Sequence, residues 1–130
     1  MAILFGPASF TLVRGTRWDD DVTLTDKKTG LPVNLVGIVG ITMRVRKTID
    51  STIAAQLSMA AGTIVLVNPA AGVIGIRCNS AFTLTFPANG NRKAKYVYDA
   101  VIERTAGEYE PGISGKVTVV PTVTRAQGIT

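Results

Sequence analysis

The chain has 130 residues, with 14 Lys and Arg against 9 Asp and Glu (formal net charge +5), no histidine and one cysteine. Without histidine, Ser-His-Asp and Cys-His catalysis and His-ligated zinc are excluded, and the lone Cys78 excludes an internal disulfide or a four-thiolate metal site. Val, Ile and Thr supply 42 residues, which is typical of β-strands, and the length suits one domain. We therefore expect a non-enzymatic protein with no cofactor.

The N-terminal segment, residues 1–9, predicts an arm rather than a secretion signal. It has no basic region, and Gly6-Pro7 ends its apolar run before a signal-peptide core can form. An exposed apolar arm is a liability unless it docks on a partner. We therefore expect partner contacts from its apolar residues Met1, Ile3, Leu4 and Phe5.

Alternation with a period of two begins at Phe10 and Leu12, breaks at Arg14-Gly15, and resumes after Trp18. This layout predicts two short extended segments between Phe10 and Leu24. The cluster Asp19-Asp20-Asp21 lies on the second one, where consecutive side chains of an extended segment point to opposite faces. We interpret these aspartates as solvated or partner-facing charges and expect no metal site. Trp18 is the one strong candidate for stacking on a carbohydrate, but we favour a tryptophan that packs in the core or against a hairpin.

Ile41, Met43 and Val45 alternate with Thr42, Arg44 and Arg46, which predicts a half-buried strand with a basic outer row. Residues 51–76 carry no formal charge and are long enough to span a bilayer. Their apolar residues nevertheless fall into short runs around Asn68-Pro-Ala-Ala71, which predicts a β-hairpin and no membrane partner. For Ile53–Ala61 the pattern leaves a short helix and a strand both open.

A further period-two segment, Ser80–Pro87, leads to a polar, basic loop that ends in Arg92 and Lys93. Lys95–Arg104 is the clearest strand, with Tyr96 and Tyr98 on one face, and Gly115–Val120 returns beside it with Val117 and Val119 pointing inward. Seven or eight short strands at this spacing predict an antiparallel sandwich or barrel.

Two stretches resemble immunoglobulin-like modules of tailed-phage virion proteins, such as the N-terminal domain of siphophage upper baseplate proteins and small tail and head accessory proteins. Thr29-Gly-Leu-Pro-Val-Asn-Leu-Val-Gly37, followed by Ile41–Arg46, is similar to their opening. Tyr96-Val-Tyr-Asp-Ala-Val-Ile-Glu103, with Ile113–Val119 and Val123-Thr-Arg125, is similar to their ending, and Phe10–Leu24 is similar in layout to their first hairpin.

The resemblance covers about residues 10–125 and implies an all-β fold, a single immunoglobulin-like antiparallel β-sandwich of about seven or eight strands, with residues 126–130 as a tail. Within it, Asn34 is suited to fix a turn by bonding neighbouring backbone, and Gly37 permits a positive φ. The resemblance also implies a structural subunit of a virion that docks in several copies on other virion proteins, at the tail or baseplate or on the head.

Two other function classes remain open at this point. A single-stranded nucleic-acid-binding OB-type module also combines short strands with basic residues, although here the aromatic residues fall on the expected core face. A carbohydrate-binding adhesin would use Trp18. We favour the structural reading, in which Arg44, Arg46, Arg92 and Lys93 contact acidic protein surfaces.

Overall fold

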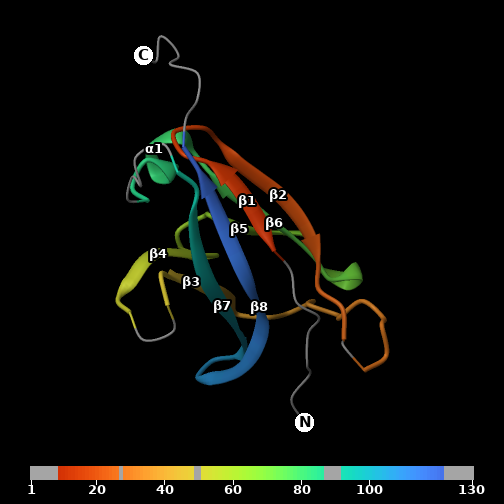
Figure 1. Cartoon of the computed structure of the whole chain (residues 1–130). Coiled ribbons are helices and arrows are strands. Elements are labelled where there is room, and N and C mark those ends of the chain that lie inside the picture. The colour runs from red at the N-terminus through yellow and green to blue at the C-terminus, as the bar shows by residue number, and fades with distance from the viewer. Residues whose placement is uncertain (1–8, 27, 49–50, 87–91, 122–130) are drawn as a thin grey trace.

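Eight strands form two sheets that pack face to face in the computed structural model, which describes residues 9–26, 28–48, 51–86 and 92–121. The larger sheet, seen toward the viewer in Figure 1, has the order β1-β8-β7-β3-β4. Its strands are β1 (Phe10–Val13), β8 (Glu108–Val120), β7 (Ala94–Thr105), β3 (Gly40–Arg46) and β4 (Ile53–Ser58). The smaller sheet has the order β2-β6-β5, with β2 (Trp18–Thr23), β6 (Val73–Cys78) and β5 (Ile64–Asn68).

The strand order makes the chain a single immunoglobulin-like β-sandwich. Strands β2, β6 and β5 take the places of B, E and D in that fold, and β3, β7 and β8 take the places of C, F and G, with β4 added beside β3. The fold class predicted from the sequence is confirmed, and the topology differs from the five-stranded OB barrel. One pair departs from the antiparallel expectation, because β1 runs parallel to β8.

The first hairpin that the resemblance implies is wrong. β1 pairs with β8 in the large sheet (Phe10 opposite Val117), whereas β2 pairs with β6 in the small sheet (Trp18 opposite Cys78). The turn at Arg14–Gly15, where Gly15 has φ 86°, therefore carries the chain from one sheet to the other. Phe10 and Trp18 then meet across the core, with ring centroids 5.8 Å apart.

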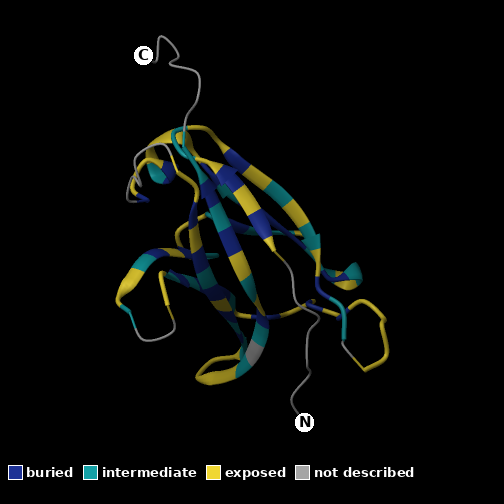
Figure 2. Cartoon of the chain, viewed as in Figure 1, coloured by how far each residue is buried: buried dark blue, intermediate teal, exposed yellow. Residues whose placement is uncertain are grey.

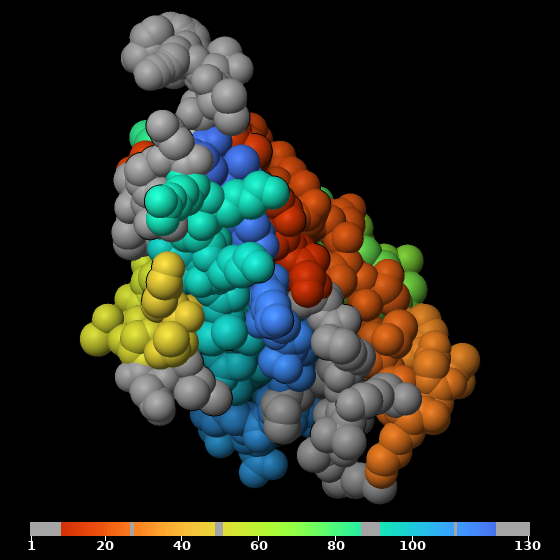
Figure 3. Space-filling model, in the orientation of Figure 1, coloured from red at the N-terminus to blue at the C-terminus, as the bar shows by residue number. Residues whose placement is uncertain are grey.

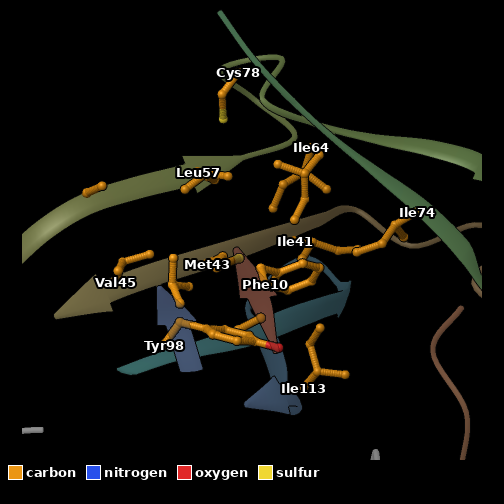
Figure 4. Close-up of a cluster of buried hydrophobic side chains, with 14 of the residues drawn as sticks. Phe10, Ile41, Met43, Val45, Leu57, Ile64, Ile74, Cys78, Tyr98 and Ile113 are labelled. Carbon is orange, nitrogen blue, oxygen red and sulfur yellow. The ribbon is translucent and has the colours of Figure 1, made fainter. Parts of the chain in front are cut away.

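Period-two alternation builds the core between the sheets. On β7, Tyr96 and Tyr98 point inward between exposed Lys95 and Asp99, and the pattern is visible as alternating bands in Figure 2. Figure 4 shows the inward side chains of both sheets pointing toward one another, including Met43 and Tyr98 from the large sheet and Ile74 from the small one. The predicted inward residues of β8, Val117 and Val119, are also buried.

The uncharged stretch between Asp50 and Arg77 forms strands. Ile53–Ser58 is a strand, which decides the alternative left open above, and a turn follows it. β5 and β6 are joined by the 3-10 turn Pro69–Ala71 and pair antiparallel, so the predicted hairpin is confirmed. Among the described residues, no helix has the length and apolarity needed to cross a membrane.

Part of the segment Ser80–Pro87 is helical rather than extended, and β8 begins earlier than Gly115, at Glu108. The short helix α1 (Ser80–Thr83) starts where the Asn79 side chain accepts a hydrogen bond from the Phe82 backbone N–H (2.8 Å). This N-cap favours a helical turn over the strand that alternation alone predicts. Phe86 still reaches the core, where it is fully buried against Tyr96.

The α1 segment closes one end of the sandwich through a set of hydrogen bonds that we call the α1 latch. The buried Thr83 hydroxyl accepts from the Gly15 N–H (2.9 Å) and lies 2.7 Å from the Thr16 carbonyl oxygen, to which it donates. Arg14 donates from Nε to the Phe86 carbonyl (2.7 Å) and from Nη2 to the Leu84 carbonyl (3.1 Å). The turn between the sheets is thus attached to α1 by side chain–backbone bonds.

Candidate interaction surfaces

The described residues contain no group of three or more Cys, Asp or Glu side chains placed to hold a metal ion. The one thiol, Cys78, lies in the core, and burial, helped by the nearby Asp19 carboxylate, raises its pKa to about 12. A thiol with this pKa stays protonated at neutral pH and is a poor nucleophile.

The three aspartates of β2 each engage a different partner. Asp19 pairs with Arg17 (3.0 Å), Asp21 pairs with Arg77 (2.6 Å), and the Asp20 carboxylate accepts from the indole N–H of Trp18 (2.8 Å). Asp19 and Asp21 lie outward and Asp20 is half-buried, as expected for consecutive residues of a strand. Because two of the three carboxylates are paired with arginines, the cluster is not a strong acidic patch.

Trp18 lies in the core and is only 2% exposed, as the favoured packing role predicts, so it presents no ring to a carbohydrate. Its ring packs on Phe10, and its indole N–H donates a hydrogen bond to the Asp20 carboxylate. A tryptophan at the start of a strand can point to either face, and here the crossing between sheets points it inward. Among the described residues, the aromatic side chain that is largely exposed is instead Tyr109, at 66%.

The outer face of β3, β7 and β8 carries the basic row that the sequence predicts. On β3, Arg44 lies beside Asp99 of β7, and on β8, Lys116 lies beside Val97. Arg46 approaches Asp99 at 4.0 Å, and Arg44 donates to Gln56 of β4 (3.3 Å). These side chains border a groove of about 350 Å³, which we call the basic groove; its lining residues include Arg44, Arg46, Val97, Asp99, Ser114 and Lys116.

Further cations extend this face toward the α1 end. Lys95 lies outward on β7, and Arg92 and Lys93 are exposed just before it. The Lys47 ammonium lies 5.2 Å from the centre of the Tyr96 ring, which points into the core, so Lys47 lies outside the outer face. Arg44, Arg46, Lys95 and Lys116 oppose one carboxylate of this face, Asp99, a net charge of +3, which is most of the net +4 that the described residues carry.

Toward the β7–β8 hairpin, the same face carries exposed apolar and acidic residues in place of the basic ones. A second hollow, also of about 350 Å³, lies between the hairpin, the end of β4 and the start of β3, and its lining includes Val39, Met59, Val101, Glu103 and Tyr109. Val39 is 51% exposed and Tyr109 66%. Glu110 pairs with Arg104 (2.9 Å), whereas Glu103 accepts a bond from the Gly107 N–H, and Glu108 is exposed. We call this region the hairpin tip.

Of the predicted contact residues, Arg44 and Arg46 lie together in the basic groove, whereas Arg92 and Lys93 are exposed just before β7 and do not line it. Figure 3 shows β1, β8 and β7 side by side across this face. Met1, Ile3, Leu4 and Phe5 lie outside the described residues. Sequence reasoning missed Tyr109 and Val39, because exposure at a strand end leaves no periodic signal. It also missed Lys116, although the alternation with Val117 and Val119 places Lys116 on the outer face of β8.

The predicted turn residues act locally. The Asn34 side chain accepts from the Val36 N–H (2.9 Å), and Gly37 has φ 83°, so both behave as the sequence suggests. The Asn34 carbonyl also accepts a bond from Arg104 (3.2 Å), which ties this loop to the end of β7. These residues support the hairpin end rather than form a separate site.

No family model matches the chain, and no curated protein matches it. Among solved structures, one similar chain is Drosophila OTK, extracellular domains 3-5, with 17% identity and a TM-score of 0.29. The match covers 91% of this chain and 35% of that structure, so the chain spans about a third of its length. A likeness at this level says nothing about function, and the immunoglobulin-like assignment rests on the strand order of the chain itself.

Proposed function

We propose that the protein is a non-enzymatic structural subunit of a phage particle, located in the virion and docked in several copies on other virion proteins. A tail or baseplate position is favoured over head decoration. The proposal combines the resemblance of residues 10–125 to immunoglobulin-like virion modules with the surface properties of the sandwich. No cofactor or small-molecule substrate is part of it.

The observation that carries the proposal is the basic outer face of β3, β7 and β8. Its cations gather around one groove and are opposed only by Asp99 among the carboxylates of that region. A concentrated charge on one sheet face steers association with a surface of opposite sign. An acidic protein surface fits this face, because the aromatic residues that would stack on nucleic-acid bases, such as Tyr96 and Tyr98, are buried.

Purified particles from the parent phage provide the direct test. Quantitative mass spectrometry is expected to find the protein in several copies per particle, and deletion of its gene is expected to remove a defined density from the tail or baseplate in electron micrographs. Absence of the protein from purified particles would overturn the proposal. Density lost from the head instead would keep the structural role and reject the favoured position.

Nucleic-acid binding is the second candidate, favoured only by the basic face. It predicts an affinity for single strands that falls steeply as salt rises, because phosphate neutralisation releases counterions. A filter-binding series from low to physiological salt measures this. Tight binding that Arg44→Glu and Lys116→Glu abolish would support the second candidate against the structural proposal.

A further inference from the structure

We propose that the basic groove binds the hairpin tip of a second copy of this chain, so that copies associate head to tail. The inference rests on the proposed function, in which several copies are docked together, and it names the partner of the basic groove. The expected occupant of the groove is a second copy, because both halves of the contact are present on each chain, on the same sheet face but in different places.

The hairpin tip has the chemistry of an interface anchor. Tyr109 is 66% exposed at the start of β8, and Glu108 precedes it at the turn. Tyrosine supplies a large contact area with few rotatable bonds, and such side chains dominate the binding energy of interfaces. Arg104 forms a salt bridge with Glu110. The other two carboxylates of the tip, Glu103 and Glu108, form no salt bridge with a described residue.

The basic groove has the complementary chemistry. Its charged lining is Arg44, Arg46, Lys116 and Asp99, a net +2, which matches the −2 of Glu103 and Glu108 at the tip. Between these charges Val97 is half-buried, which leaves an apolar surface for an aromatic ring. Guanidinium groups also stack on aromatic faces, so Arg44 and Arg46 suit the Tyr109 ring of the second copy.

The two surfaces cannot satisfy each other within one chain. Asp99, in the groove, and Glu103, at the tip, are separated along the same extended strand, β7, with Val101 between them. A contact between a groove and the tip of another copy is heterologous when the reciprocal groove and tip stay free, whereas engagement of both pairs at once would give a closed two-fold dimer. Repetition of such a contact closes a ring or continues as a filament, according to the rotation between copies.

Charge reversal at the two exposed positions tests the contact with the full chain. Wild type, Lys116→Glu and Glu108→Lys are compared by sedimentation velocity over a concentration series at low salt. We expect wild type to associate beyond the dimer, and each single variant to associate at least about tenfold more weakly. An equimolar mixture of the two variants, and the double variant K116E/E108K, are expected to regain association, because opposite charges again face each other.

Lys28→Glu is the matched control, because Lys28 is exposed, lines neither surface, and its reversal changes net charge as much as Lys116→Glu does. It is expected to associate like wild type at the same salt. Circular dichroism melts of every variant check that the fold is kept. Association that is unchanged in both single variants, or not regained in the mixture, would overturn the head-to-tail contact, as would a wild type that stops at a dimer.

Failure of this contact and failure of the proposed function give different results. A wild-type chain that stays monomeric at every concentration but is present in several copies per particle would reject the head-to-tail contact alone. A chain that associates as described but is missing from purified particles would reject the virion role and keep the contact.

Discussion

The two ends of the sandwich differ in how their polar groups are bonded and how their apolar side chains are buried. At the α1 end, the latch joins Arg14, Gly15 and Thr16 to the α1 segment, and Phe86 and Cys78 are buried below it. At the hairpin end, Val39 and Tyr109 are exposed and two carboxylates have no salt-bridge partner among the described residues. The polar groups at the first end find their partners within the chain, whereas the side chains at the second end are exposed and able to contact another molecule.

This difference assigns stability and association to different residues. Side chains with every partner inside the fold lower the free energy of the native state, and truncating them leaves cavities or unpaired groups. Exposed side chains at the hairpin tip contribute little to folding, since they are already in water. Substitutions at the α1 end should therefore affect unfolding, and those at the hairpin end should affect association.

The largest effect is expected from Phe86→Ala. Phe86 is fully buried and lies edge-on to Phe82 and Tyr96. Removing a buried phenyl ring costs about 3–5 kcal/mol, and urea unfolding measures the loss. Leu84→Ala, two residues away and 50% exposed, is the control and should cost less than about 1 kcal/mol. Equal losses for the two variants would contradict the assignment of Phe86 to the core.

Thr83→Val should have the next largest effect. The change keeps the shape of the side chain but removes the hydroxyl that bonds Gly15 and Thr16, leaving the half-buried Gly15 N–H without its acceptor. We expect a loss of about 1–2 kcal/mol. Thr85→Val provides the control, because Thr85 is exposed and bonds only the Phe82 carbonyl, so it should cost less than about 0.5 kcal/mol. Similar unfolding midpoints for both variants would show that the latch contributes little.

We also expect the protein to lose stability in alkali, because the buried thiol of Cys78 ionises less readily than the same thiol in the unfolded chain. Burial raises the pKa of Cys78 from 9.0 to about 12, and it also raises the pKa of Tyr98. The unfolded chain therefore loses the Cys78 proton first, so stability is intact below about pH 9 and falls as the pH rises toward 12. For Cys78 alone we expect a loss of about 1 kcal/mol at pH 10. Cys78→Ala should remove the loss that begins near pH 9 and leave the loss that Tyr98 causes above about pH 10. An unchanged profile would contradict the burial of the thiol.

The smallest change in stability is expected at the hairpin end. Tyr109→Ser should alter the free energy of unfolding by less than about 0.5 kcal/mol, because the ring is mostly in water. The same substitution should weaken association in sedimentation velocity, since it removes the aromatic anchor. A large loss of stability without loss of association would reverse the assignment of this end.

Much of the fold could be predicted from alternation alone, and the exceptions have identifiable causes. Tyr96 and Tyr98 on β7, and Ile41, Met43 and Val45 on β3, are buried where a period of two places them. Alternation cannot tell which sheet a strand joins, because an inward residue looks the same in either one. This is why Phe10–Leu24 reads as a hairpin although the chain crosses between the sheets.

The candidate surfaces were only partly predictable. The basic row of Arg44 and Arg46 is predicted by the alternation of β3. Tyr109 comes just after a turn and Val39 just before a strand, where exposure depends on tertiary packing. The Asn79 cap likewise outweighs the alternation of Phe82, Leu84 and Phe86 in forming α1. Local hydrogen bonding and the closure of the sandwich decide these positions, and neither has a periodic signature.

The parallel pairing of β1 with β8 has a mechanical consequence. The chain enters β1 at Phe10, opposite Val117, and leaves β8 at Val120, opposite Val13. Tension applied through the two chain ends would therefore slide these strands along each other and strain all of their bonds at once, rather than open them one by one. Under such a load, this four-residue ladder would act as the clamp that keeps the sandwich closed.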